Sequence, residues 1–182
     1  MQSSQPVTPI SQQPVYQQLV EQLQQQQTTT QLTHNFLPWL QKSIPLVAHL
    51  GIQQLYWQPQ QPLCLSMDIN FNPLVNDKGT AFGGGVAGLA TLLGWCWVTL
   101  VRQATGNAGP VVVKESNNKF SAPITSNFSL HCQAVNPELL PEFLHQLQKH
   151  KKASLDLTIK AQQQATTAFS YQGTYVALSS NS

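Results

Sequence analysis

Hydrophobic and polar positions divide this chain into one long apolar run and several shorter segments in which the two kinds of residue alternate. The long run covers residues 83–101 and contains no charged side chain. An apolar run of roughly 18 to 20 residues is long enough to span a bilayer, and it can equally form the centre of a protein core. The run therefore predicts one dominant helix, in either a membrane or a folded core.

Glycines within this run favour the buried helix over the membrane helix. They stand at positions 83, 84, 85, 88 and 94. Each costs about 0.5–1 kcal/mol relative to alanine inside a helix. Such a helix becomes favourable where a sheet packs closely around it, because a residue without a Cβ lets backbone approach backbone. The flanking segments also lack the short basic loops that accompany membrane helices.

The segments on either side of the run carry the alternation of half-buried strands. In residues 63–71 every second residue is apolar, which predicts a strand with one face in the core. Short helical turns are expected within 32–50 and a short helix within 138–152. Strands are predicted at 50–57, 63–71, 111–115, 128–134, 155–159 and 168–178, with a break and restart at 120–124. Together these elements predict an α+β fold in which a mostly antiparallel sheet of about five to six strands wraps the long central helix.

The first thirty residues differ in composition from the rest. They are rich in glutamine, and so few apolar residues cannot offset the entropy lost on ordering. We predict a flexible tail over 1–30, one domain over 31–178 and a frayed tail at 179–182. An alternative stays open for part of the first tail, because Tyr16, Leu19, Val20 and Leu23 share helical spacing and predict a short amphipathic helix, docked or not.

Composition limits the classes of partner. Of the 182 residues only 9% are charged, and the formal net charge is +2. A chain with so little basic character gives little support for nucleic-acid binding. Its length fits one domain plus a tail and allows a sizeable core.

Cysteine usage and the amino terminus bear on the compartment. Cys64, Cys96 and Cys132 are odd in number, widely spaced and set among apolar residues, so we predict reduced core residues rather than a disulfide framework or a metal site. The first residues show neither a basic start nor an apolar signal region. These features predict a cytoplasmic protein without a membrane anchor.

Two motifs beside the long helix carry a resemblance to a known family. Residues 76–84 have the sequence NDKGTAFGG and lead into the helix, and residues 116–124 have the sequence SNNKFSAPI, with a proline near the end. Over roughly residues 36–178 the chain resembles the hotdog-fold thioesterase superfamily. It is most similar there to a bacterial "putative thioesterase" family, found free-standing or fused behind an acetyltransferase-like domain.

This resemblance implies an acyl-thioester site at the amino end of the central helix. The carbonyl of the substrate would lie against the free N–H groups there, which the helix dipole reinforces. Gly83 and Gly84 occupy this amino end of the helix, and Asn76 is a further hydrogen-bond donor. The alternative is that the glycines serve only helix–sheet packing. Substrate-binding roles are expected for Thr80, Phe82, Asn117 and Phe120.

The sequence departs from many hotdog thioesterases, which carry a carboxylate on the central helix. Residues 83–101 contain no Asp, Glu or His, and Phe82 occupies the position of a frequent histidine. Asp77 is the nearest carboxylate in sequence, and it is either a candidate base or a turn residue. Hydrolysis by a general base is thereby disfavoured. Decarboxylation of a malonyl thioester needs only donors for an enolate oxygen and an apolar pocket.

The resemblance also implies the partners. Members of this kind are implicated in converting malonyl carrier protein to acetyl carrier protein, which primes fatty-acid synthesis. The expected substrate is thus a thioester of coenzyme A or of a carrier protein, with no cofactor and no metal. Hydrolysis by a thioesterase and acyl binding without chemistry remain alternatives.

A homodimer or dimer of dimers is expected, because strand 111–115 is apolar enough to need a partner. Residues 117–120 could then close over the helix start of the second subunit.

Overall fold

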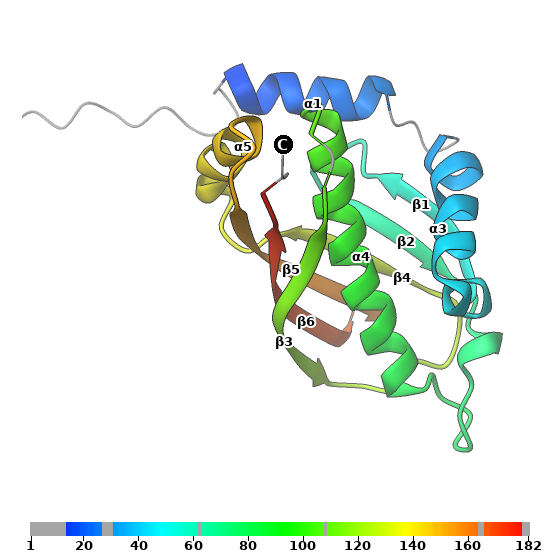
Figure 1. Ribbon diagram of the computed structural model, residues 1–182. Coiled ribbons are helices and arrows are strands. Elements are labelled where there is room, and N and C mark those ends of the chain that lie inside the picture. Colours follow the sequence, from blue (N-terminus) through cyan, green and yellow to red (C-terminus); the bar gives the residue numbers. More distant parts are fainter. Residues whose placement is uncertain (1–13, 27–30, 62, 108, 164–165, 180–182) are drawn as a thin grey trace, which may run out of the picture.

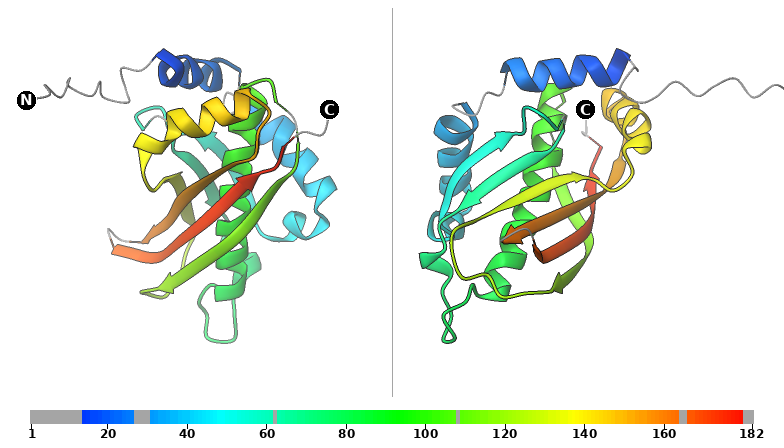
Figure 2. Two further views of the ribbon diagram at one scale, coloured as in Figure 1. Left: turned by 60° about the vertical axis from the view of Figure 1, so that its left-hand side comes forward. Right: turned by 180° about the vertical axis from the view of Figure 1, so that it is seen from behind.

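A single long helix, α4 (Gly83–Ala104), runs through the molecule, and a curved sheet wraps around one side of it (Figure 1). The structure is a computed structural model that describes residues 14–26, 31–61, 63–107, 109–163 and 166–179. Two further views show the strands crossing α4 at a steep angle (Figure 2).

The sheet has six strands in the order β1-β2-β4-β5-β6-β3, and all neighbouring strands pair antiparallel. The strands are β1 (Ile52–Trp57), β2 (Leu65–Ile69), β3 (Val111–Phe120), β4 (Phe128–Ala134), β5 (Ala153–Gln163) and β6 (Thr166–Ala177). This is the predicted α+β fold with a central helix, so the fold prediction is confirmed. β1 and β3 form the two edges.

Smaller helices surround the ends of this core. α1 (Pro14–Gln26) lies across the carboxyl end of α4, near α5, and α3 packs beside the β1 side of the sheet (Figure 1). The remaining elements are η2 (Leu32–Phe36), α3 (Leu37–Ser43), η3 (Pro45–His49), η4 (Asn72–Leu74), η5 (Pro137–Leu139) and α5 (Leu140–Gln148).

Burial of α4 explains its apolar sequence. In the described part of the chain it is the one helix long and apolar enough to cross a membrane, and 61% of its most apolar stretch is buried inside the protein. Leu89, Leu93 and Trp97 are fully buried. The Trp97 indole N–H donates to the Leu63 carbonyl at 2.7 Å, which satisfies the one polar atom of this ring. The sheet supplies the apolar environment that a lipid bilayer would otherwise provide.

One glycine of α4 permits the closest contact between helix and sheet. A Cβ at Gly94 would overlap the ring of Tyr175 on β6. The Tyr175 hydroxyl lies 2.9 Å from the Thr91 carbonyl and 2.9 Å from the hydroxyl of Tyr171. Because burial raises the pKa of Tyr175, its hydroxyl stays protonated and available for these bonds. The absence of a side chain at Gly94 thus leaves space for the ring of Tyr175, whose hydroxyl hydrogen-bonds to the helix backbone.

Each strand presents one face to α4 and one away from it. On β5 the apolar residues Leu155, Leu157 and Ile159 point toward the core, while Asp156 and Lys160 are exposed on the other side. We call this second side the outer face.

The three cysteines, Cys64, Cys96 and Cys132, are buried and unpaired, as expected of core residues.

The amino-terminal segment differs from the flexible tail predicted for residues 1–30. Residues 14–26 form α1, and Leu19 and Leu23 on it are buried in the main core. The open alternative of a docked amphipathic helix therefore describes this part, because two leucines at helical spacing suffice to hold a glutamine-rich helix on α4 and α5. Residues 1–13, 27–30 and 180–182 of the predicted tails lie outside the described residues.

Strand β3 differs from its predicted boundaries. It continues without a break from Val111 to Phe120, with a register shift between Val113 and Glu115. A bulge of this kind inserts one residue and reverses which side chains face the core. As a result Phe120 pairs with Phe169 and points to the inner face, whereas Asn117 pairs with Gln172 and points to the outer face.

Two glycines of α4 provide a matched test of this packing. Gly94→Ala should lower the free energy of unfolding by about 1–3 kcal/mol, because the new methyl group overlaps Tyr175. Gly88→Ala should raise it by about 0.5–1 kcal/mol, because the Cβ would meet open space and alanine is the better helix former. Urea denaturation measures both. Equal effects of the two substitutions would contradict the described packing of α4.

Candidate active site

The amino end of α4 offers unpaired backbone donors. Phe82 has an extended conformation (φ −62°, ψ 118°) and caps the helix. The first helical bond runs from the Val86 N–H to the Phe82 carbonyl at 3.1 Å. The N–H groups of Gly83, Gly84 and Gly85 precede it and have no acceptor among the described residues. This end carries a partial positive charge that favours an anion or a developing oxyanion.

Backbone bonds from two other segments hold this helix start in place. The Phe82 N–H donates to the Leu74 carbonyl at 2.7 Å, and the Ala81 N–H donates to the Ile124 carbonyl at 2.8 Å. Val75 and Ala81 pair as an isolated bridge, so residues 75–81 form a small hairpin. In Figure 1 this hairpin projects below the sheet, and the chain after β3 passes near the start of α4.

A pocket of about 400 Å³ opens beside the helix start. Its walls come from the end of the hairpin, the first turn of α4, the segment that follows β3, and β6. None of its lining residues is ionisable. They are Thr80, Ala81, Gly83, Val86, Phe120, Ser121, Ala122, Pro123, Ile124 and Phe169.

Two exposed aromatic rings lie over the glycines. A Cβ at Gly83 would approach the Phe120 ring to 3.3 Å, and a Cβ at Gly84 would approach the Phe82 ring to 2.7 Å. Phe82 and Phe120 are 60% and 55% exposed. Phe120 also packs on the buried Phe169, with ring centroids 5.0 Å apart. Apolar surface and backbone donors thus meet at one end of α4.

Asn76 has a structural role in the hairpin. Its Oδ1 accepts from the backbone N–H groups of Lys78 at 2.9 Å and Thr80 at 3.1 Å. Its Nδ2 donates to Thr80 Oγ1 at 3.0 Å. Since an amide nitrogen carries two hydrogens, one donor of Asn76 remains next to Thr80, which lines the pocket. Of the predicted site residues, the structure brings Thr80, Gly83 and Phe120 into the pocket wall.

Asp77 lies outside the pocket. It occupies the tip of the hairpin, its side chain is 81% exposed, and it lies 3.6 Å from the ammonium group of Lys78. A well-solvated carboxylate of this kind has little reason to act as a base on a substrate held at Gly83. Its position fits the alternative role of a turn residue.

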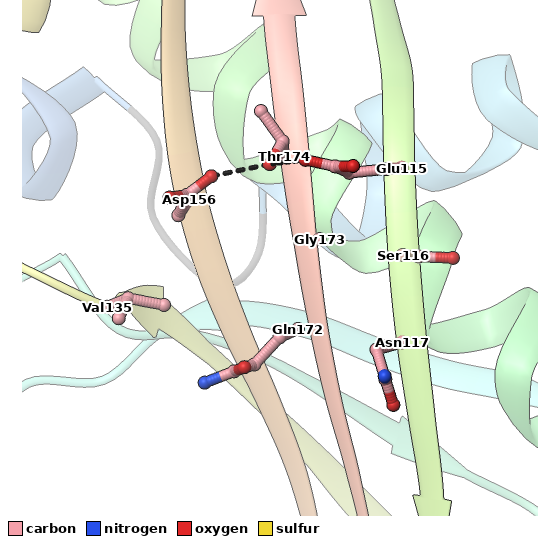
Figure 3. A pocket seen from close by; sticks show the side chains of 8 residues that line it. All are labelled: Glu115, Ser116, Asn117, Val135, Asp156, Gln172, Gly173 and Thr174. Carbon is pink, nitrogen blue, oxygen red and sulfur yellow. Dashed lines mark hydrogen bonds between the residues drawn. The ribbon is translucent and has the colours of Figure 1, made fainter.

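Asn117 lies elsewhere as well. It borders a groove on the outer face, together with Gln172 of β6 (Figure 3). In the same groove Thr174 donates to Asp156 at 2.6 Å. The bulge in β3 turns Asn117 away from the α4 of its own chain. A substrate-binding role for Asn117 therefore stays a prediction, with contact only to a second subunit.

The sequence missed Phe169 and Ile124 as parts of the pocket. Phe169 lies on β6 and pairs with Phe120, more than 40 positions earlier. Its apolar character and alternation showed that it faces the core. The strand order that places it next to the helix start depends on long-range pairing, which local patterns do not determine.

A family model described as "Putative thioesterase (yiiD_Cterm)" matches residues 30–179. The chain belongs to this family. We refer to it as the yiiD_Cterm family. No curated protein matches the chain significantly.

Solved structures share the fold at low identity. A "putative thioesterase" from Shewanella oneidensis is 21% identical, with a TM-score of 0.68 over 81% of this chain and 97% of that one. A protein of unknown function from Chlorobaculum tepidum TLS is 23% identical, with a TM-score of 0.71 over 84% and 98%. A "Probable Thioesterase" from Pseudomonas aeruginosa is 15% identical, with a TM-score of 0.60 over 82% and 93%. These likenesses show that the yiiD_Cterm chain has the hotdog fold.

The hairpin predicts different effects for two neighbouring substitutions. Asn76→Ala should lower the free energy of unfolding by about 1–2 kcal/mol, since it removes hydrogen bonds to Lys78 and Thr80. Asp77→Ala should change it by less than about 0.5 kcal/mol, as is usual for an exposed surface position. Chemical denaturation of the two variants provides the comparison. A larger loss for Asp77→Ala would show that the hairpin is built differently.

Proposed function

We propose that this protein decarboxylates a malonyl thioester of coenzyme A or of a carrier protein to the acetyl thioester. One observation supports this most: the free N–H groups at the start of α4 open beside a pocket whose lining holds no ionisable side chain. Such a site can stabilise negative charge on a carbonyl oxygen, yet it has no general base.

The reaction follows from this arrangement. The bond between the carboxylate carbon and the methylene carbon breaks, carbon dioxide leaves, and the electron pair forms an enolate of the thioester. The N–H groups of Gly83 and Gly84 and the free donor of Asn76 would hold the enolate oxygen. A proton from solvent then converts the methylene carbon to the methyl group of the acetyl thioester. No step requires a side-chain base.

The apolar walls would assist the loss of carbon dioxide. Phe120, Ile124 and Phe169 line the pocket, and Phe82 lies over Gly84 at the helix start. A carboxylate next to such surfaces loses part of its hydration, while the product carbon dioxide is uncharged. The activation free energy is therefore lowered as charge moves from the carboxylate to the enolate oxygen, which can accept hydrogen bonds from the backbone donors.

Thioester hydrolysis is the second candidate, because the family description is that of a thioesterase. It requires a group that activates water. The nearest carboxylate in sequence is Asp77, which would have to leave Lys78 and approach the pocket. Decarboxylation needs no such group, which supports it over hydrolysis as our proposal.

Product analysis separates these functions. Malonyl and acetyl thioesters of coenzyme A and of a carrier protein are incubated with the full chain, and carbon dioxide, thioester and free thiol are quantified. We expect carbon dioxide and acetyl thioester in equal amounts from the malonyl substrates. Free thiol with malonate would establish a hydrolase instead, and unchanged substrate would indicate a binding module.

Kinetics of two variants test the roles of individual residues. Asn76→Ala should lower turnover of the malonyl thioester by on the order of 10²–10³, the loss typical of one oxyanion donor, at a temperature where the variant is folded. Asp77→Asn should retain nearly full turnover. A loss of about 10²–10⁴ in Asp77→Asn, as expected for removal of a general base, would instead support hydrolysis.

We also propose that the protein is a homodimer joined along β3. This strand forms one edge of the sheet, and Val112 and Val113 on it are 42% and 40% exposed. An apolar edge strand with unpaired backbone groups is a template for pairing with a second copy. A dimer of dimers would use a further surface.

A matched pair of valines tests the dimer. Val113→Lys should shift the protein toward monomers of about 20 kDa in sedimentation experiments, because a charge on the edge strand opposes pairing. Val135→Lys changes an equally exposed valine at the end of β4 and should leave the dimer intact. A parent protein that sediments as a monomer would refute this assembly.

A further inference from the structure

A second cavity lies on the outer face of the sheet, on the side away from α4. We call it the outer-face pocket. Its volume is about 350 Å³, and strands β4 and β5 form its floor beside the turn that joins β1 to β2. It is lined by Gln58, Gln60, Gln61, Cys64, His131, Gln133, Thr158, Lys160 and Gln162.

The lining of this pocket is polar and holds no acidic side chain. Five of its nine residues are glutamines, and it contains a lysine and a histidine but no aspartate or glutamate. Lys160 forms no ion pair among the described residues. Polar residues on an outer face need no ligand to explain them. A hollow that gathers hydrogen-bond donors and an uncompensated cation, however, has the chemistry of an anion site.

His131 is held in a defined orientation. Its Nδ1 lies 2.8 Å from the hydroxyl oxygen of Ser66, and the amide nitrogen of Gln58 lies 3.0 Å from the same oxygen and 3.4 Å from Nδ1. Ser66 is fully buried. Since Gln58 presents N–H donors, this arrangement favours the tautomer in which Nδ1 accepts and Nε2 carries the hydrogen.

The register of the two strands places Lys160 next to the imidazole ring of His131. His131 on β4 pairs directly with Lys160 on β5, and such cross-strand neighbours have Cβ atoms about 4.5–5.5 Å apart. Gln133 and Thr158 form the next pair that borders the pocket. Backbone pairing therefore sets the ammonium group and the imidazole on one wall of the pocket.

We propose that the outer-face pocket binds a small anion, a molecule that carries a phosphate or carboxylate group. The Lys160 ammonium supplies the charge, the His131 Nε2–H supplies a fixed donor, and the amide of Gln133 supplies an adaptable donor. This site is separate from the pocket at the start of α4, because the two lie on opposite faces of the sheet. It stands independently of the proposed decarboxylation.

Charges around His131 give the binding a pH dependence. Burial lowers the pKa of His131, and the nearby Asp68 carboxylate opposes this effect more weakly. Tyr56 hydrogen-bonds to Asp68, and Cys64 borders the pocket. The pKa values of the Tyr56 hydroxyl and the Cys64 thiol are raised, so neither of these two groups adds negative charge at neutral pH. A bound anion favours the imidazolium form and raises the pKa of His131. Affinity should therefore increase as the pH falls through the pKa of the complex.

The test is a titration of the full chain with inorganic phosphate and, separately, with acetate. The Cε1–H resonance of His131 is followed by NMR at constant ionic strength with chloride as the reference anion, and it is assigned among the five histidines by its loss in His131→Gln. We expect saturable movement of this resonance and a raised pKa of His131. Whichever anion binds more tightly identifies phosphate or carboxylate as the ligand group.

Two lysines on the outer face provide the matched variants. Lys160→Gln should weaken binding by about tenfold or more, as for loss of a charge-assisted hydrogen bond. Lys119→Gln removes a lysine of β3 that lies outside the pocket and should change binding by less than about twofold. No saturable response to either anion, or equal losses in both variants, would overturn the proposal. Because neither residue belongs to the site at α4, decarboxylation can fail or succeed without affecting this result.

Discussion

The close packing of α4 against a curved sheet is the constraint on which the rest of this molecule depends. A helix interrupted by glycines is intrinsically weak, and it is stabilised here because β6 approaches it closely enough for Tyr175 to occupy the space beside Gly94 and bond the Thr91 carbonyl. That contact fixes the position of α4 along the sheet. The helix begins at Gly83, beside the Phe120 ring at the end of β3.

The site follows from this position. Because the helix starts at the rim of the sheet, its first N–H groups lack acceptors in the described structure, and the hairpin 75–81 and the segment after β3 leave them next to an apolar pocket. Glycine serves two purposes along one helix: at Gly94 it admits a tyrosine, and at Gly83 and Gly84 it leaves backbone donors uncovered except by the exposed rings of Phe82 and Phe120. Packing and the proposed chemistry therefore share one sequence feature.

Much of this could be predicted from the sequence, and the failures have physical causes. The uncharged run and the strict alternation of β5 determine helix and strands locally, so the fold and the position of Gly83 at the start of the helix were accessible. The outward direction of Asn117 was not accessible, because the bulge between Val113 and Glu115 reverses the alternation, and alternation alone cannot show an inserted residue. The docking of Leu19 and Leu23 was obscured by the glutamines around them, and Phe169 reaches the pocket only through long-range strand order.

We propose that backbone donors act on the substrate in a pocket whose lining holds no titrating side chain. The most direct test is the pH dependence of kcat/KM for a malonyl thioester. We expect a flat profile between about pH 5.5 and 8.5, because the substrate carboxylate is ionised throughout and no lining residue changes charge. A bell-shaped profile, or a limb that disappears in Asp77→Asn, would contradict it and require a general acid or base at the start of α4.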